Sequence, residues 1–113
     1  KYKNWCDEYF YLPHRKEARG IGGIFFDYKK NNFENDFKFV RDAGVTFQLL
    51  FNKIIRKKIK KKWSIKDKEI QYIKRGRYTE FNLLYDRGTK FGLHTGGNVE
   101  GILMSLPPMA KWK

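Results

Sequence analysis

The feature that most constrains this chain is a run of apolar side chains at helical spacing between residues 33 and 55. Apolar residues three or four positions apart share one face of an α-helix, so the run predicts a long amphipathic helix from about residue 33 to about residue 60. Basic residues crowd its end, where the helix macrodipole favours cations. The residues of this face are Phe33, Phe37, Val40, Gly44, Phe47, Leu50, Phe51, Ile54 and Ile55.

Shorter patterns predict two further helices and four strands. Apolar spacing favours a helix over residues 2–12, and Ser64 with Asp67 is a capping signal for a helix from about 64 to 74. Residues 20–28 are β-branched and aromatic with glycines, which is typical of a strand. Alternation from Tyr78 to Tyr85 predicts the first strand of a three-stranded antiparallel meander, with further strands at 90–95 and 99–106. We therefore expect an α+β fold, an antiparallel β-sheet flanked by helices, in one domain over residues 1–113.

The positive charge of the chain is concentrated in one segment. There are 25 Lys and Arg against 12 Asp and Glu overall, and residues 53–77 alone hold 12 basic and two acidic side chains. Such a segment can follow a phosphate backbone or an anionic membrane surface. The interpretation that the sequence favours is a solvated helix end and loop, since no helix-turn-helix, zinc-finger or RNA-binding motif accompanies the segment. Charge alone therefore names no partner.

The cellular context is constrained by what the sequence lacks. No apolar run approaches the ~20 residues that a membrane span needs, and residues 1–4 do not start a signal peptide. Cys6 is the only cysteine, which excludes an internal disulfide and fits a reducing compartment. These features predict a cytoplasmic protein with no membrane span. The chain starts with Lys1 rather than Met, and we expect it to be a piece of a longer polypeptide.

Three polar stretches carry more charge than packing requires. They are His14-Arg15 with Arg19, then Arg75-Gly76-Arg77, then Asp86 to Lys90 followed by Gly96-Gly97-Asn98. The guanidinium fork pairs bidentately with carboxylates, so these arginines suit a ligand that bears several carboxylates. The alternative interpretation is ordinary turn chemistry, because Asp-x-Gly and Gly-Gly-Asn are common turn sequences. His14 and His94 are too distant in sequence to indicate a metal site by themselves.

Several strings together resemble the C-terminal half of the oxygen-dependent coproporphyrinogen III oxidases. The resemblance runs in order, with compatible spacing, over essentially all 113 residues. The strings are Trp5 to Phe10, His14-Arg15 with Arg19 to Asp27, Arg75 to Tyr78 with Glu80 to Leu83, Tyr85 to Leu93, and Ile102 to Pro107.

This resemblance implies an enzyme of haem (porphyrin) biosynthesis. Members oxidatively decarboxylate two propionates of coproporphyrinogen III to vinyl groups, giving protoporphyrinogen IX, with O2 as co-substrate and without flavin or haem. The implied fold is a large antiparallel sheet flanked by helices, and the implied partner is a second copy, bound through the Tyr78–Lys113 region rather than any nucleic acid. Because only the C-terminal portion is matched, we expect the 113 residues to be inactive alone, as a partial gene product, as the product of a degraded gene, or as an inactive subunit that dimerises with a full-length paralogue.

The resemblance also implies roles for individual residues. Asp86 is implied to face the centre of the macrocycle, where its carboxylate accepts hydrogen bonds from pyrrole N–H groups and takes a proton or stabilises positive charge. Arg87 is implied to pair with a substrate carboxylate or to position Asp86. Gly96, Gly97 and Asn98 are implied to form a substrate-binding turn, whose backbone N–H groups approach a propionate.

A metal site and a second function class complete the expectations. His14 falls on a histidine that ligates a divalent metal ion in bacterial members, with its partner histidines in the N-terminal half. The residues themselves leave open a different class of protein, a small basic module that uses residues 53–77 to bind nucleic acid or anionic lipid.

Overall fold

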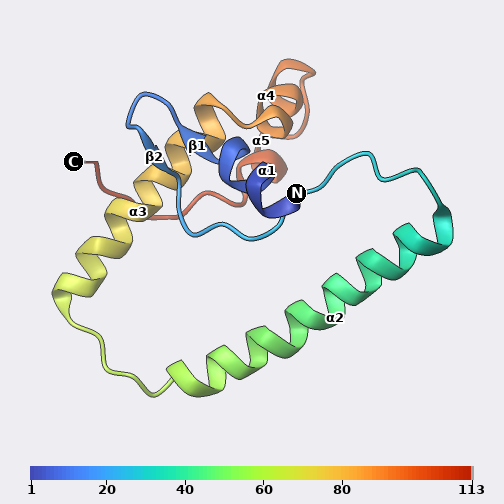
Figure 1. The fold of residues 1–113 in the computed structure, drawn as a ribbon. Helices are drawn as coiled ribbons and strands as arrows, with labels where there is room; N and C mark the ends of the chain where they lie inside the picture. Colours follow the sequence, from blue (N-terminus) through green and yellow to red (C-terminus); the bar gives the residue numbers. More distant parts are fainter. Residues whose placement is uncertain (113) are drawn as a thin grey trace. The chain divides into compact units, whose positions relative to one another are not determined.

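The computed structural model describes residues 1–112, which form two compact units. One unit joins residues 1–25 to the residues from Ser64 onward, and the other is residues 26–63. The first unit contains α1 (Tyr2–Tyr9), β1 (Tyr11–Leu12), β2 (Glu17–Ala18), α3 (Ile65–Leu84), α4 (Arg87–His94) and α5 (Val99–Leu103), and the second contains α2 (Phe33–Lys58) (Figure 1).

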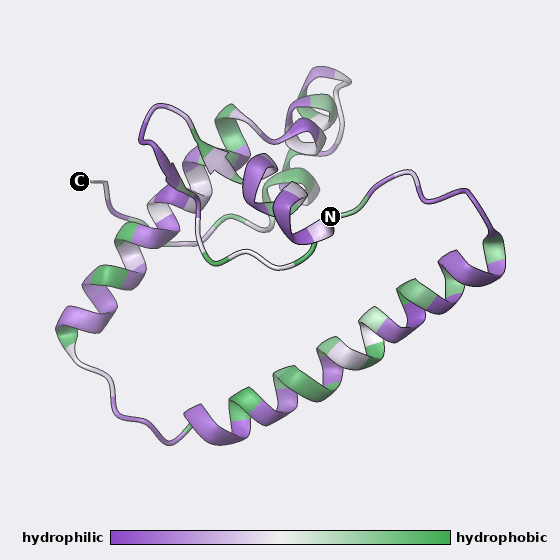
Figure 2. Ribbon diagram, viewed as in Figure 1, coloured by the Kyte–Doolittle hydropathy of each residue, from purple (hydrophilic) through white to green (hydrophobic). Residues whose placement is uncertain are grey.

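Helix α2 confirms the long helix predicted from residue 33. It begins at Asn32, whose side-chain oxygen accepts the backbone N–H of Asn35 at 3.0 Å, and its last turn is basic. Figure 2 shows apolar and polar residues interleaved along its whole length. The structure describes every residue of α2, and none of them is buried.

The first unit begins with a helix and a hairpin that pack on α3. Helix α1 confirms the prediction over residues 2–12, although it ends at Tyr9 because a hairpin follows it. Strands β1 and β2 are antiparallel, with Tyr11 opposite Ala18 and Leu12 opposite Glu17. The turn between them contains Lys16 at a φ of 53°. The sequence analysis missed this hairpin because its strands are only two residues long.

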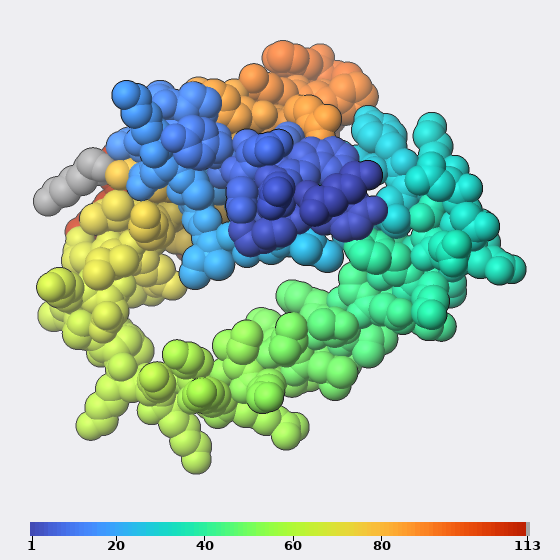
Figure 3. Space-filling model, in the orientation of Figure 1, coloured from blue at the N-terminus to red at the C-terminus, as the bar shows by residue number. Residues whose placement is uncertain are grey.

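The core of the first unit is a cluster of aromatic rings. Tyr9 stacks on Phe25 with ring centroids 4.7 Å apart, and Phe10 lies 5.2 Å from Phe81. Phe81 is fully buried, as is Leu12 from the hairpin. Figure 3 shows the blue N-terminal segment packed against the yellow and orange segment that contains α3. Burial of these rings therefore joins two parts of the chain that are distant in sequence.

The predicted three-stranded meander is wrong. Helix α3 continues through residues 78–85, and the segments predicted as strands at 90–95 and 99–106 contain α4 and α5. Ser64 and Asp67 form a reciprocal capping box that starts α3, as the sequence predicted, and no proline interrupts the helix after it. Gly76, Arg77 and Phe81 are its buried residues, a set that follows helical spacing rather than the alternation of a strand.

The predicted strand over residues 20–28 is also wrong. These residues form no regular element, because they meet no partner strand and glycines at 20, 22 and 23 weaken extended structure. Instead the loop is held at its end by the N–H of Phe25, which donates to the carbonyl of Tyr2 at 3.1 Å. Within residues 1–112 the sheet is the β1–β2 pair alone, so the fold is mostly helical with a small antiparallel sheet and agrees with α+β.

None of the helices over residues 1–112 combines the length and the apolar character that crossing a membrane requires.

Candidate functional site

Asp86 is the N-cap of α4 and lies at the junction of three elements. Its Oδ2 accepts the backbone N–H of Thr89 at 2.7 Å and the Thr89 hydroxyl at 2.9 Å. Its Oδ1 accepts the hydroxyl of Tyr9, from the end of α1, at 3.1 Å. The spacing of Asp86 and Thr89 is a capping signal, and this local chemistry replaces the turn predicted at this place.

These contacts keep Asp86 ionised. Burial alone would raise the pKa of its carboxyl group, but the hydrogen bonds from Thr89 and Tyr9 and the charge of Arg19 together lower the pKa below its ordinary value. A carboxylate in this state accepts hydrogen bonds and stabilises positive charge well, and it is a weak proton acceptor at neutral pH.

Arg87 is held beside Asp86 by the same tyrosine. Its backbone N–H donates to the Tyr9 hydroxyl at 3.1 Å, and its guanidinium lies 4.9 Å from the centre of the Tyr9 ring. The Tyr9 hydroxyl therefore accepts from Arg87 and donates to Asp86 at once. The structure thus brings together two predicted site residues through a third that the sequence analysis did not name as one.

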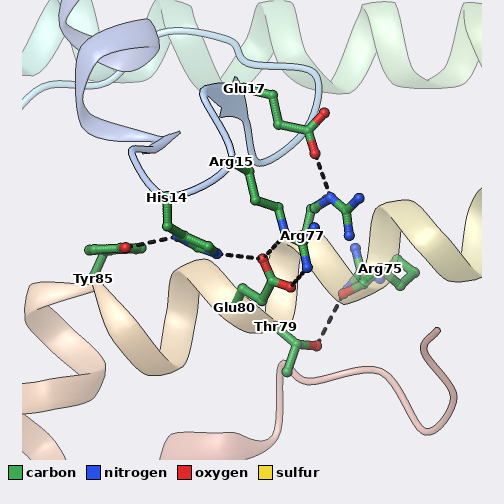
Figure 4. Close-up of polar contacts among 8 residues, drawn as sticks. All are labelled: His14, Arg15, Glu17, Arg75, Arg77, Thr79, Glu80 and Tyr85. Carbon is green, nitrogen blue, oxygen red and sulfur yellow. Dashed lines mark hydrogen bonds and ion pairs between the residues drawn. The ribbon is translucent and has the colours of Figure 1, made fainter. Parts of the chain in front are cut away.

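A second cluster surrounds Glu80, on α3 (Figure 4). Arg15, from the turn of the hairpin, donates to both Glu80 oxygens at 2.5 Å in a bidentate pair. His14 forms a hydrogen bond with Glu80 through its Nε2, at 3.0 Å, and another with the Tyr85 hydroxyl through its Nδ1, at 2.8 Å. The hydrogen bonds from Arg15, outweighing burial, and a smaller contribution from His14 lower the pKa of Glu80.

The surroundings of His14 do not fit a metal site in this chain. Both ring nitrogens have hydrogen-bond partners, and residues 1–112 contain no group of three His, Cys, Asp or Glu side chains that could hold a metal ion. The role of His14 as a metal ligand remains a prediction. What the geometry provides instead is a hydrogen-bonded link between the hairpin and α3.

Arg77 and Glu17 form the inner ion pair of the hairpin, as Figure 4 shows. Arg77 is buried on α3, and its Nε donates to Glu17 on β2. Lys74 lies 3.7 Å from the other Glu17 oxygen. The hydrogen bond from Arg77 outweighs burial and lowers the pKa of Glu17. Arg77 is therefore part of the packing between the hairpin and α3.

A pocket of about 710 Å³ lies beside this ion pair, between residues 17–21 and the middle of α3. Arg19 and Arg75 both line the pocket and both lie over Tyr78, with guanidinium carbons 4.8 and 4.1 Å from the centre of its ring. Lys74 adds a third cation. The residues that line the pocket are Glu17, Ala18, Arg19, Gly20, Ile21, Lys74, Arg75 and Tyr78.

Arg19 connects the pocket to Asp86. Burial lowers the pKa of its guanidinium, which means that this charge lacks full solvation. Its Nε is buried without a hydrogen-bond partner among residues 1–112. The same charge helps to lower the pKa of Asp86. A partly desolvated guanidinium gains from pairing with an anion, and a carboxylate is the anion that its fork fits best.

The predicted substrate-binding turn connects α4 and α5. Gly96 has a left-handed φ of 71°, and the N–H of Gly97 donates to the Gly92 carbonyl at 2.9 Å. The side chain of Asn98 caps α5 by accepting the N–H of Gly101 at 3.3 Å. These residues therefore have structural partners in this chain, and no contact in the structure tests their substrate-binding role.

Sequence reasoning found the charged residues of this region but not their partners. The sequence predicts Tyr9 on a helix and Tyr78 at the start of a strand. Glu80 lies in a string shared with the family but has no implied role, and Glu17 lies outside those strings. Glu80 has a usable signal, because it lies one helical turn after Arg77 and would share its face if α3 were recognised as a helix. The pairing of the hairpin with α3 has no such signal in the sequence, since residues 14–19 and 77–80 meet only in the tertiary structure.

Comparison with known proteins identifies the family. The coproporphyrinogen III oxidase family model matches residues 1–113. The chain is similar to the oxygen-dependent coproporphyrinogen-III oxidases of Rickettsia rickettsii (strain Sheila Smith), Rickettsia bellii (strain OSU 85-389) and Rickettsia akari (strain Hartford), with 62%, 61% and 60% identity over 113 residues. Each match covers 99% of this chain and 40% of the relative, so the chain spans 40% of the length of these relatives. The chain belongs to the coproporphyrinogen III oxidase family.

Proposed function

We propose that this chain carries part of the active site of an oxygen-dependent coproporphyrinogen III oxidase, and that it corresponds to the C-terminal portion of the family's fold. The observation that supports this most is the combination of an ionised Asp86 with the cationic pocket of Arg19, Lys74 and Arg75. A porphyrinogen with four carboxylates needs cations at its edge and an acceptor for its pyrrole N–H groups. The pocket supplies the cations, and Asp86 supplies the acceptor.

The proposed reaction converts two propionates to vinyl groups. Each conversion breaks the bond to the carboxyl carbon, which leaves as CO2, and removes one hydrogen with its electron pair from the neighbouring carbon. The electron pair of the broken bond forms the C=C bond, and O2 accepts the hydrogen with its electron pair together with one proton from solvent, giving H2O2. Positive charge develops on the pyrrole as the electrons leave, and a carboxylate near the macrocycle centre stabilises it.

The side chains of this site have different roles in the proposal. Asp86 holds the macrocycle, since Oδ1 accepts one hydrogen bond from Tyr9 and retains a lone pair for a pyrrole N–H. Its low pKa favours stabilising the developing cation over taking a proton. Arg87 positions Asp86 through Tyr9, and Arg19 with Arg75 binds a propionate that is not consumed. Gly96, Gly97 and Asn98 hold a second carboxylate, with the backbone N–H of Asn98 as the donor, because the N–H groups of Gly96 and Gly97 donate to the carbonyls of Leu93 and Gly92.

The proposal extends to cofactors, partner and location. O2 is the co-substrate, and neither flavin nor haem is used. No step is assigned to a metal ion at His14, because both ring nitrogens are engaged within the chain. The partner is a second copy bound through the Tyr78–Lys113 region, and the apolar residues Leu83, Leu84 and Phe91, which are exposed there, support this. The location is the cytoplasm.

Coproporphyrin III, the stable oxidised tetracarboxylate, provides the binding test. Fluorescence titration of the full 113-residue chain should give binding that Arg75→Gln weakens about 10-fold, the effect of losing one charge-assisted carboxylate contact. Arg41→Gln is the matched control, because Arg41 is exposed on α2 and pairs only locally with Asp42. Equal affinities of the two variants would contradict the proposed pocket.

A turnover measurement accompanies the titration. The chain alone should form no protoporphyrinogen IX from coproporphyrinogen III in air, since it spans 40% of its relatives' length. Formation of product by the purified chain would show that the site is not partial.

The second candidate function is a basic binding module. It is favoured by the exposure of every basic side chain from Lys53 to Lys62, seven in all. A salt titration separates this candidate from the enzyme, because binding by unpaired cations alone weakens steeply as the salt concentration rises.

A further inference from the structure

The hydroxyl group of Tyr9, at the end of α1, makes hydrogen bonds whose direction is fixed by its partners. The backbone N–H of Arg87 can only donate, and it lies 3.1 Å from the Tyr9 oxygen. The ionised carboxylate of Asp86 can only accept, and its Oδ1 lies 3.1 Å from the same oxygen. Tyr9 is therefore an acceptor toward Arg87 and a donor toward Asp86, and no other placement of its proton keeps both bonds.

The aromatic ring of Tyr9 is held on several sides, so its hydroxyl group has a fixed position. The ring stacks on Phe25 with the ring planes 9° apart, and Phe10 and Phe81 meet it edge-on at centroid distances of 4.8 and 5.5 Å. Phe81 is itself fully buried on α3. Stacked and edge-to-face rings are favourable beyond the area that they bury. A donor that is in place before a ligand arrives needs no reorganisation when the ligand binds.

Hydrogen bonds within the chain fill most of the acceptor capacity of Asp86. An ionised carboxylate has about four lone-pair sites, two on each oxygen. Thr89 fills both sites on Oδ2, through its backbone N–H at 2.7 Å and its hydroxyl at 2.9 Å. Tyr9 fills one site on Oδ1. Residues 1–112 supply no further donor to this half-buried carboxylate, so a ligand finds one open site, on Oδ1.

We propose that Tyr9 is a positioning residue for Asp86, because its hydroxyl group restricts the carboxylate to one incoming hydrogen bond, received on Oδ1. This inference rests on the proposed function, in which Asp86 accepts a pyrrole N–H. A porphyrinogen presents four pyrrole N–H groups around its centre, and a carboxylate with both sites on Oδ1 open would accept from two of them. With one site open, the N–H of a single ring is bound, and the macrocycle is held in a defined orientation.

The same count of lone pairs constrains proton transfer. A proton added to Asp86 has to occupy the open site on Oδ1, since Thr89 and Tyr9 fill the other sites. A pyrrole N–H bound at that site would then lose its acceptor. Asp86 is thus either the acceptor for a bound macrocycle or the carrier of a proton, and not both at once. Tyr9 acts on the substrate only through Asp86.

The first experiment needs no substrate and removes only the hydroxyl group, leaving the ring in its packing. Tyr9→Phe should raise the pKa of Asp86 toward its ordinary value of 3.8, because the ionised form loses a donor. Tyr11→Phe is the matched control and should leave that pKa unchanged, since Tyr11 is 40% exposed on β1. The charge of Arg19, which also acts on Asp86, is the same in both variants.

The measurement is carbon-13 NMR of the full chain labelled at its aspartate carboxyl carbons. The signal of Asp86 is identified by its loss in Asp86→Asn. An Asp86 pKa that Tyr9→Phe does not move would overturn the assignment of Tyr9 as its donor.

The second experiment measures binding of coproporphyrinogen III to the full chain under nitrogen, by isothermal titration calorimetry. Tyr9→Phe should weaken binding about 5-fold, the effect of one hydrogen bond, and Tyr11→Phe should not. Added to Asp86→Ala, Tyr9→Phe should cause no further loss, because its route to the substrate is already removed. Losses that multiply in the double variant would assign Tyr9 a purely structural role and overturn the proposal.

The outcomes separate this inference from the proposed function. Absence of binding by the unmodified chain would overturn the proposed function, and the role of Tyr9 toward a macrocycle with it. Binding that Tyr9→Phe leaves unchanged, or strengthens by opening a second site on Oδ1, would overturn the role of Tyr9 alone.

Discussion

Asp86 has a structural task that is separable from any chemistry it performs. Its side chain satisfies the first turn of α4 through Thr89 and holds the end of α1 through Tyr9. A cap of this kind is worth about 1 kcal/mol, and asparagine caps almost as well as aspartate. The charge of the carboxylate and its capping oxygen can therefore be removed one at a time.

Substitution of Asp86 should separate these contributions. Asp86→Ala should lower the free energy of unfolding by about 1 kcal/mol at neutral pH, while Asp86→Asn should lower it less. The measurement is urea denaturation followed by circular dichroism, with both variants compared at equal protein concentration. A larger loss for Asn than for Ala would contradict the role of Asp86 as a cap.

The lowered pKa of Asp86 gives the effect a direction in pH. Because the folded-state pKa lies below the ordinary value of 3.8, the ionised side chain stabilises the fold above that value and the contribution is lost as the pH falls through the lower folded-state pKa. The difference between the unmodified chain and Asp86→Asn should therefore shrink as the pH falls below the ordinary pKa of 3.8. A difference that grows on acidification would mean that the sign of the pKa shift is wrong.

At the scale of elements, the backbone of the C-terminal segment docks on α3 at Gly76. The N–H of Lys111 donates to the carbonyl of Tyr72 at 3.1 Å, and Lys111 pairs with Glu69 at 2.7 Å. A Cβ at Gly76 would lie 2.3 Å from the carbonyl oxygen of Lys111, and one of the two backbone segments would have to move to relieve this clash. The backbone of Lys111 thus passes so close to residue 76 that only a glycine fits between Arg75 and Arg77.

Gly76→Ala should destabilise the protein although alanine is the better helix former. The clash with the Lys111 backbone should outweigh the gain of about 1 kcal/mol in helix propensity, for a net loss of 1 to 3 kcal/mol. Gly44→Ala is the matched control, because its added methyl meets nothing within 4 Å and should stabilise α2. Thermal unfolding checks both, and a stabilised Gly76→Ala would show that the segment does not dock as described.

Much of the helical structure could be predicted from the sequence. Strong local signals identified α1, α2 and the start of α3, where Ser64 and Asp67 cap the helix. The helical conformation of residues 78–85 could not be predicted. The alternation from Tyr78 to Tyr85 is compatible with a strand, whereas burial of both Arg77 and Phe81 requires a helix. Only the packing of α3 against Leu12 and the aromatic rings decides between them.

The candidate site shows the same limit. Asp86 and Arg87 were named from the sequence, and the structure gives both a definite environment. Glu17, Glu80 and Tyr9 were not, because each acquires its partner from a segment 60 or more residues away. Which arginine faces a pocket and which faces an ion pair depends on those tertiary contacts, so sequence alone could not separate Arg75 from Arg77.

For the molecule as a whole, the question is whether the net charge of +13 serves to bind a partner. Each unit described here has a different pattern. In the first unit Arg15, Arg77 and Lys111 pair with glutamates, whereas the lysine-rich end of the second unit is exposed. When unpaired surface cations bind a nucleic acid, the affinity falls as salt rises and does not depend on the nucleotide sequence.

A salt titration with a DNA duplex should therefore show only electrostatic binding. Seven cations on phosphates predict a loss of about 6000-fold in affinity between 50 and 200 mM salt, with no preference among duplexes. Replacing Lys60, Lys61 and Lys62 with glutamine should reduce the slope of log affinity against log salt by about 2.7, while the same change at Lys1, Lys3 and Lys16 should alter it little. Sequence-specific binding that persists at physiological salt would favour the basic module over the enzyme.

The interruption of the first unit by residues 26–63 has a consequence for how the chain folds. Its core joins residues before position 26 to residues after position 63, as in the contact of Tyr9 with Asp86, 77 positions apart. Each such contact must close a long loop before any burial rewards it, and the entropic cost rises only with the logarithm of loop length. Folding of the first unit should thus be slow for so helical a protein, while lengthening or shortening the intervening segment should change its rate only slightly.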